Sequence, residues 1–184
     1  MNERLPYFRS SDRINAFHAQ LVEWRGTRWA HAGVRPNEMR CGVTGDCLFW
    51  VHVFKAIGAL PATVEVPEYI RGHALRDAMA MLRERIEGTG RAVQVDYLLG
   101  NPGIWYAVKT GDVLLFKNGT SGVHCGLVIG EHPVHFTHLS QDGLITEPLN
   151  QKQWLGNLAV VYRLMEADPE TTGGHRPPLQ AVTA

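Results

Sequence analysis

The sequence predicts an α+β fold in which N-terminal helices pack on an antiparallel β-sheet. Apolar residues recur at helical spacing in the first half of the chain, whereas short β-type runs separated by turn residues fill the second half. Helices followed by strands, rather than alternating with them, are typical of α+β proteins. A chain of 184 residues suffices for one core. We therefore expect a single domain over residues 1–165 and a flexible tail over 166–184, where Pro, Gly and Thr are frequent.

The first half of the chain predicts three helices. The spacing of the apolar residues predicts an amphipathic helix over residues 10–24. After a long loop with glycines and a proline, a second helix is expected from Cys47 to Ile57, ending at Gly58, because glycine is the usual left-handed residue after a helix. A third, half-exposed helix is expected over residues 69–86.

The second half predicts the strands of the sheet. After "GTG" the pattern changes to short runs rich in β-branched and aromatic residues. In chain order these runs are "AVQVDYLL", "GDVLLF", "HCGLVIG", "VHFTHL", "GLITEPL" and "LAVVYRL". Because they follow one another without intervening helical segments, the sheet should be antiparallel.

Composition excludes several classes of partner and compartment. Lys and Arg number 18, Asp and Glu number 18, and the pI is near 7.1, so no overall field recruits nucleic acid or a membrane surface. Three cysteines do not form the even framework of a small secreted protein, which favours reduced thiols. The start "MNERLPYFRS" lacks the apolar region of a signal peptide. We expect synthesis in the cytoplasm without a signal peptide.

Cys47 is the cysteine whose position indicates chemistry. A free cysteine is most often a small buried hydrophobic residue. If Asp46 caps the second helix, however, the Cys47 thiol lies in its first turn, where unpaired backbone N–H groups and the helix dipole favour the thiolate. The same N–H groups can bind a developing oxyanion. Cys41 lies in the loop and Cys125 within a strand, so we expect both to be structural.

His124 is the candidate for the base that such a thiol requires. A catalytic cysteine commonly takes its base from a distant part of the chain. Among nine histidines, His124 begins an otherwise apolar strand, where a polar imidazole needs a partner. Strand alternation places Cys125 on the opposite face from His124, so these two side chains should not share a site.

The next strand offers two histidines that could orient His124. A three-residue turn at residues 130–132 would place His138 opposite His124, with His135 pointing to the other face. We favour His138 as the orienting residue, with His135 as the alternative if the register slips by one residue. A strand that carries incidental histidines is the other interpretation.

Three stretches in this order resemble motifs of the NlpC/P60 superfamily of papain-like cysteine peptidases. "RGTRWAHAGVRPNEMRCGVTGDCLFWV" is similar to the Gly-Thr-Pro-Tyr entry that precedes the Asp-Cys of the nucleophile helix. "TGDVLLFKNGTSGVHCGLVIG" resembles the strand pair that carries the base, and "FTHLSQDGLITEPL" resembles the strand that supplies the third polar group. The phage and gene-transfer-agent cell-wall peptidases are most similar, in the long loop before Asp-Cys and in the "ITEPL" ending that Trp154 completes.

The resemblance implies a papain-like fold and a hydrolytic activity. It implies Cys47 as the nucleophile, His124 as the base and His138 as the orienting residue, with Asp46 and Trp29 in supporting positions. Such enzymes cleave amide bonds of peptidoglycan stem peptides, commonly between D-glutamate and the following diamino acid, through an acyl-enzyme and without a metal or cofactor. Peptidoglycan peptide is then the substrate, and phage tail or prophage proteins are expected partners that deliver the protein to the cell wall.

The chain also departs from the family pattern beside the nucleophile. Arg28 and Trp29 replace the Pro-Tyr of the entry motif, and bulky Leu48, Phe49 and Trp50 follow Asp-Cys, where Ser or Gly is usual. Trp29 could pack beside the site, although its more frequent role would be that of a core residue, and we expect the bulky residues to narrow the substrate groove.

Two other functions compete with the hydrolase. The same fold could serve as a non-catalytic tail-assembly or peptide-binding component, which the departures beside the nucleophile favour. A zinc site formed by Cys41, Cys47, His124 and a further histidine is the other alternative, although the two cysteines are not in a close two-residue-spaced pair.

Overall fold

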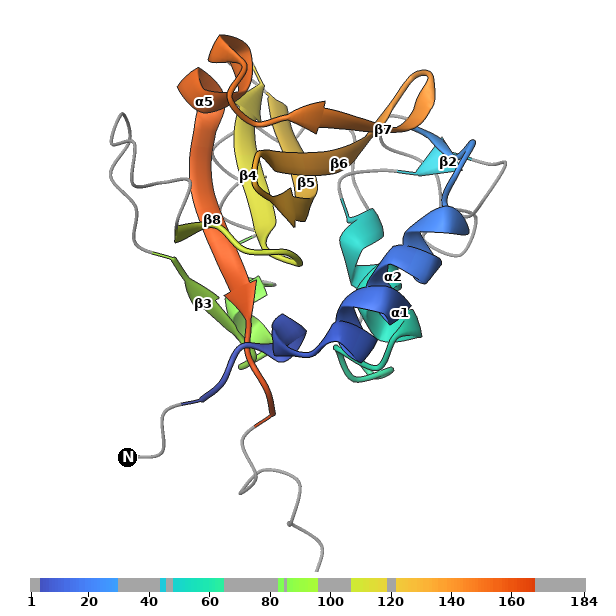
Figure 1. Ribbon diagram of the computed structural model, residues 1–184, viewed down its shortest axis with the longest axis vertical. Coiled ribbons are helices and arrows are strands. Elements are labelled where there is room, and N and C mark those ends of the chain that lie inside the picture. The colour runs from blue at the N-terminus through green and yellow to red at the C-terminus, as the bar shows by residue number, and fades with distance from the viewer. Residues whose placement is uncertain are drawn as a thin grey trace, which may run out of the picture.

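The computed structural model has the α+β architecture that the sequence predicts (Figure 1). It describes residues 4–29, 44–45, 48–64, 83–84, 86–95, 107–118 and 122–167. The elements, in chain order, are η1 (Tyr7–Arg9), α1 (Ser11–Val22), β1 (Arg28–Trp29), β2 (Thr44–Gly45), α2 (Phe49–Ala56), β3 (Ala92–Gln94), β4 (Val113–Asn118), β5 (Gly122–Glu131), β6 (Val134–Ser140), β7 (Gly143–Pro148), α5 (Lys152–Asn157) and β8 (Leu158–Leu164).

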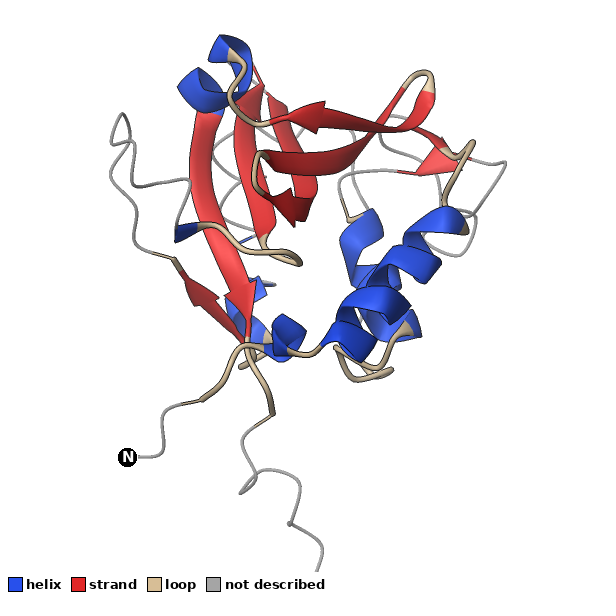
Figure 2. Cartoon of the chain, viewed as in Figure 1, coloured by secondary structure: helices blue, strands red, loops and turns tan. Residues whose placement is uncertain are grey.

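A six-stranded antiparallel sheet forms the centre of the molecule. Its strand order is β3-β8-β4-β5-β6-β7, so β4, β5, β6 and β7 follow one another as a meander and β8 returns beside β4. Figure 2 shows α1 and α2 together on one side of the sheet, with α5 at its other end. β1 forms a short parallel pair with β2 and also contacts β6 and β7.

The two faces of the sheet bury separate cores. One core joins α1 and α2 to the face that carries Cys125 and Leu127, and the other lies on the face that carries Val128 and Phe136. Because side chains alternate along a strand, consecutive residues of β5 enter different cores. The prediction that Cys125 lies on the opposite face from His124 is therefore confirmed, since the His124 ring contacts Phe116 of the second core.

The helices differ from their predicted bounds at the ends. Ser10 caps α1, its hydroxyl accepting from the Arg13 N–H at 3.4 Å. The second helix begins at Phe49, two residues later than predicted, and its N-cap residue is Leu48 rather than Asp46. Leucine offers no side-chain acceptor, and the predicted cap, Asp46, lies outside the described residues. Most of the third predicted helix, over residues 69–86, lies outside the described residues.

Bulky side chains after the predicted nucleophile enter the core. Leu48, Phe49 and Trp50 are each no more than 2% exposed and belong to the core beneath α2. The expectation that they narrow a substrate groove is wrong, because α2 turns its apolar face to the sheet.

A buried ion pair fixes the start of β4 against β8. Asp112 is 1% exposed and accepts hydrogen bonds from Arg163 Nε at 2.9 Å, Arg163 Nη2 at 2.8 Å and the Lys109 N–H at 2.8 Å. Burial raises the pKa of Asp112, and the guanidinium opposes that shift. The preceding Gly111 has φ +86°, and an added Cβ would lie 2.0 Å from the Phe8 ring, so only glycine fits there.

Removal of the Arg163 guanidinium should destabilise the fold strongly. In Arg163→Met the Asp112 carboxylate stays buried without its countercharge, and we expect a loss of about 3–5 kcal/mol in the free energy of unfolding. Arg9→Met is the matched control, because the Arg9 side chain is 55% exposed in its pair with Glu166 and should contribute less than about 1 kcal/mol. Urea unfolding of both variants measures the difference, and equal losses would contradict a structural role for the buried pair.

The predicted tail begins where the chain still contacts the domain. Glu166 pairs with Arg9 and Arg13, and its N–H bonds to the Leu5 carbonyl. Residues 168–184 lie outside the described residues, so the domain boundary at residue 165 stays a prediction.

Candidate active site

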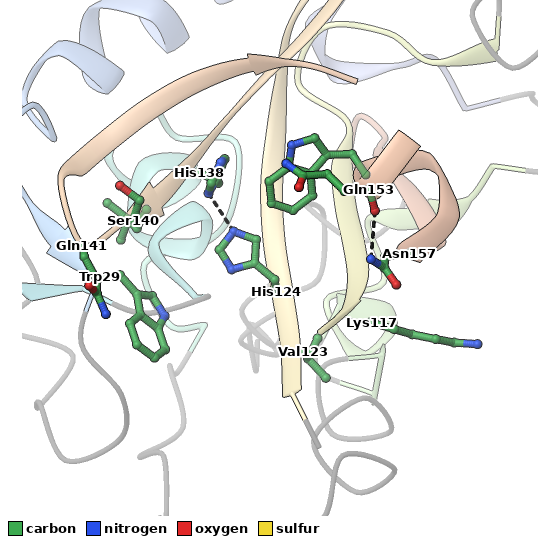
Figure 3. A pocket seen from close by; sticks show the side chains of 11 residues that line it. Trp29, Lys117, Val123, His124, His138, Ser140, Gln141, Gln153 and Asn157 are labelled. Carbon is green, nitrogen blue, oxygen red and sulfur yellow. Dashed lines mark hydrogen bonds between the residues drawn. The ribbon is translucent and has the colours of Figure 1, made fainter. Parts of the chain in front are cut away.

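His124 and His138 form a hydrogen-bonded pair across neighbouring strands. His124 Nε2 lies 2.8 Å from His138 Nδ1, and the rings meet edge to face with centroids 4.7 Å apart (Figure 3). His138 is 5% exposed, whereas His124 is half-buried. The second ring nitrogen of His124 points away from His138 (Figure 3), which leaves it able to exchange a proton with another group.

Glu147 extends this pair to a third side chain. His138 Nε2 lies 3.0 Å from Glu147 Oε2, and the Glu147 side chain is 25% exposed. Both nitrogens of His138 are thereby used, one toward His124 and the other toward the carboxylate. The three residues come from β5, β6 and β7, so the meander itself assembles the chain of hydrogen bonds.

Aromatic side chains hold the histidine rings in place. Trp154 of α5 stacks on His124 at a centroid distance of 5.8 Å and meets His138 edge-on at 5.0 Å. Phe136 stacks on His138 at 5.2 Å from the same strand. These contacts place His138 in an apolar environment, and burial lowers its pKa, helped by the nearby His124 and opposed by Glu147. His138 therefore favours the neutral form.

The pairing of β5 with β6 differs from the predicted register. The expected opposition of His124 and His138 is wrong, because Val128 pairs with Phe136 and a bulge after Val128 shifts the pairing toward the turn. The turn consists of two residues, His132 and Pro133, rather than three. The offset amounts to two residues along the strand, and so the His138 side chain stays on the His124 face and reaches it diagonally.

His135 lies apart from this pair. Its Nδ1 is 2.9 Å from the Pro133 carbonyl oxygen, near the β5–β6 turn. The structure therefore brings His138, and not His135, to His124.

The histidine pair lines a pocket of about 340 Å³. Trp29 of β1 forms one wall, which agrees with its predicted place beside the site, and Trp154 and Asn157 of α5 form another. Figure 3 shows Trp29 on the side of His124 that faces away from His138. The volume is in the range of sites that take small molecules or single residues of a peptide.

Asp46 and Cys47 lie outside the described residues, as does Cys41. Their described neighbours are Gly45, which pairs with Trp29 in the parallel β1–β2 pair, and Leu48 at the N-cap of α2. Trp29 lines the pocket, so the strand that precedes Cys47 is held against a wall of that pocket. Cys125 is described, and it is buried on the other face of the sheet.

Glu147 is the site residue that the sequence analysis missed. Its signal was the turn "SQDG": Gly143 has φ +113° and pairs with Ser140, which fixes β6 against β7. In that register Phe136 opposes Glu147, and His138 lies two residues further along the same face. The alternation of side chains along β7 could therefore have predicted that Glu147 lies on the same face as His138.

Within the part of the chain that the structure describes, no group of three or more His, Cys, Asp or Glu is placed to hold a metal ion. The cysteines of the alternative zinc site are outside that part.

Among the described segments, no helix has the length and apolar character needed to span a membrane.

A solved structure shows the fold. No protein-family model matches the sequence, and no curated protein matches it either. The crystal structure of a protein similar to lipoprotein, of the NLP/P60 family, from Staphylococcus aureus superposes with a TM-score of 0.51 at 14% identity. The match covers 88% of this chain and 44% of that protein, so the chain spans less than half of its length. This likeness confirms the predicted NlpC/P60 fold.

Burial of His138 predicts a pH dependence of stability. Its pKa is lowered from the ordinary 6.5, mainly by burial, so the unfolded chain takes up this proton at a higher pH than the folded protein. The contribution of neutral His138 is complete above pH 6.5 and is lost as the pH falls from there toward the folded pKa. Urea unfolding across this range should give a smaller loss of stability on acidification for His138→Gln than for the wild type. Parallel pH dependences would contradict the prediction.

Proposed function

We propose that the protein is a cysteine hydrolase of the NlpC/P60 type that cleaves an amide bond in peptidoglycan stem peptides. Cys47 is the nucleophile, His124 the base and His138 the residue that orients it. The observation that carries the proposal is the hydrogen bond of His124 to His138 at the wall of a pocket, with the second nitrogen of His124 left for another partner. The NLP/P60 fold of the structural neighbour supports the same reaction class.

The reaction follows from the chemistry of a thiol and an imidazole. His124 takes the proton of Cys47, and the thiolate attacks the carbonyl carbon of the amide bond. The tetrahedral intermediate collapses as the imidazolium gives its proton to the departing amine, which leaves a thioester. Water, deprotonated by His124, then releases the acid and regenerates the thiol. The neutral His138 holds the ring of His124 without adding charge to it.

The bond between D-glutamate and a diamino acid is the proposed cleavage site. The sequence resemblance supports it, and the pocket offers Lys117 and Asn157 as polar groups for a charged peptide. We further propose that a phage tail or prophage-like particle delivers the protein to the cell wall, because the sequence resembles the cell-wall peptidases of phages and gene-transfer agents.

Cys47→Ala should abolish cleavage of purified muropeptides. Removal of the nucleophile should lower the rate by roughly four to six orders of magnitude, because the members of a catalytic unit act together. Mass spectrometry of the products measures it, and Cys41→Ala is the matched control, expected to retain the wild-type rate. If the wild type and Cys47→Ala are equally inert, the protein is instead a non-catalytic binding or tail-assembly component.

Thiol reactivity should identify the same cysteine without a substrate. A thiolate activated by His124 reacts with iodoacetamide at mildly acidic pH, where ordinary thiols are protonated. We expect selective alkylation of Cys47, with Cys125 protected because it is 1% exposed. Peptide mapping after brief labelling measures each cysteine, and loss of selectivity in His124→Ala would link the reactivity to the base. Equal labelling of Cys41 and Cys47 in the wild type would contradict an activated thiol.

A further inference from the structure

Glu147 differs from the acidic residues that form ion pairs with Lys or Arg in this structure. Asp112 pairs with Arg163, Glu131 with Lys109, and Glu166 with two arginines. Among the described residues, the polar partner of the Glu147 carboxylate is His138 alone, and no Lys or Arg forms an ion pair with it. Because His138 favours the neutral form, it offers no positive charge to the partly buried Glu147 carboxylate. Its placement calls for another explanation than surface ion pairing.

The direction of the hydrogen bonds follows from the chemistry of the groups. An ionised carboxylate only accepts, so His138 must donate its Nε2–H to Glu147 Oε2. A neutral imidazole carries one N–H, which leaves His138 Nδ1 as an acceptor. His124 must then donate its Nε2–H to that nitrogen. His124 Nδ1 is left with a free lone pair, on the side that Figure 3 shows turned away from His138.

We infer that Glu147 is a positioning residue that sets the tautomer of His124 from two hydrogen bonds away. The carboxylate selects the Nε2–H form of His138, and His138 in turn selects the form of His124 whose Nδ1 accepts a proton in the pocket. The role rests on the proposed function, because a proton acceptor there matters only if a thiol or amine uses it. Without the carboxylate, His138 can carry its proton on either nitrogen, and His124 can present an N–H to the nucleophile in place of a lone pair.

The local structure supports this reading over a purely structural one. Phe136 opposes Glu147 in the β6–β7 ladder, so the strands stay paired through backbone bonds whatever side chain stands at position 147. Trp154 and Phe136 pack on the rings of the histidine pair and hold their planes. Packing fixes where the rings lie but not which nitrogen carries the proton, and the carboxylate decides the latter.

Nuclear magnetic resonance of the histidine rings tests the inference directly. Long-range proton–nitrogen correlations of protein labelled with nitrogen-15 in histidine distinguish the two neutral tautomers. At mildly alkaline pH we expect Nε2–H for both His124 and His138 in the wild type, and a mixture of tautomers at both rings in Glu147→Ala. Glu131→Gln is the matched control, since Glu131 is a similarly exposed carboxylate of β5 that bonds Lys109, and it should leave both tautomers unchanged. Unchanged tautomers in Glu147→Ala would overturn the inference.

A second variant covers the case in which Glu147→Ala does not fold. Glu147→Gln keeps the size of the side chain and removes its charge, and Glu147 is the side chain that most counteracts the lowering of the His138 pKa by burial and His124. The titration midpoint of His138 should therefore fall further in Glu147→Gln and stay at the wild-type value in Glu131→Gln. An unchanged midpoint in Glu147→Gln would overturn the inference.

Activity then separates the inference from the proposed function. In an active wild type, Glu147→Ala should lower kcat by about 10- to 100-fold, as for other carboxylates that orient a functional histidine, with little change in KM. A fall in activity without a change of tautomer would overturn the inference and leave the hydrolase intact. A wild type that cleaves no muropeptide would overturn the proposed function, while the spectra would still decide whether Glu147 sets the tautomers.

Discussion

The register of the β5–β6–β7 meander is the constraint on which the candidate site depends. His124, His138 and Glu147 come from three successive strands and meet only because both hairpins place them on one face within diagonal reach. A slip of one residue would turn His138 into the core beneath α2, where Leu139 now packs. That slip would also take Phe136, which is fully buried, out of the second core. The apolar alternation that stabilises the sheet therefore selects the same register that assembles the histidine pair.

The alternation of side chains along the strands made the face of each residue predictable, but not the exact register of the strands. The face of each strand residue follows from a period of two, so the placement of His124 and His138 on one face, and of Cys125 on the other, could be inferred from the sequence. The bulge after Val128 could not be inferred from the sequence, because it depends on how the two strands pair locally. His138 was nevertheless predicted correctly as the neighbour of His124, because an offset of two residues in the β5–β6 register leaves its side chain on the same face of the sheet. The start of α2 was predicted two residues too early, at Cys47 instead of Phe49, and its first residues are buried in the core.

Acidic residues illustrate what a motif can and cannot indicate. Asp112 belongs to the "GD" of a familiar motif, and its three hydrogen bonds in the interior fix the start of β4. Glu147 belongs to an equally short motif, yet it faces a histidine of lowered pKa. In the sequence, both are acidic residues of predicted strand runs, and only their hydrogen-bond partners in the structure distinguish their roles. The Asp112 carboxylate stabilises the fold through Arg163. The Glu147 carboxylate instead bonds to His138, and through it to His124.

The pocket lies where the two faces of the sheet meet. Leu48 and Trp29 belong to the core beneath α2, while His124 and His138 project to the opposite face. The pocket nevertheless contains consecutive residues from both faces, Val123 with His124 and His138 with Leu139, because it lies where β5 begins and β6 ends. At the ends of strands the two faces meet without a layer of backbone between them. Trp29 packs against the core and lines the pocket, and its partner strand β2 ends at Gly45, two residues before the proposed nucleophile Cys47.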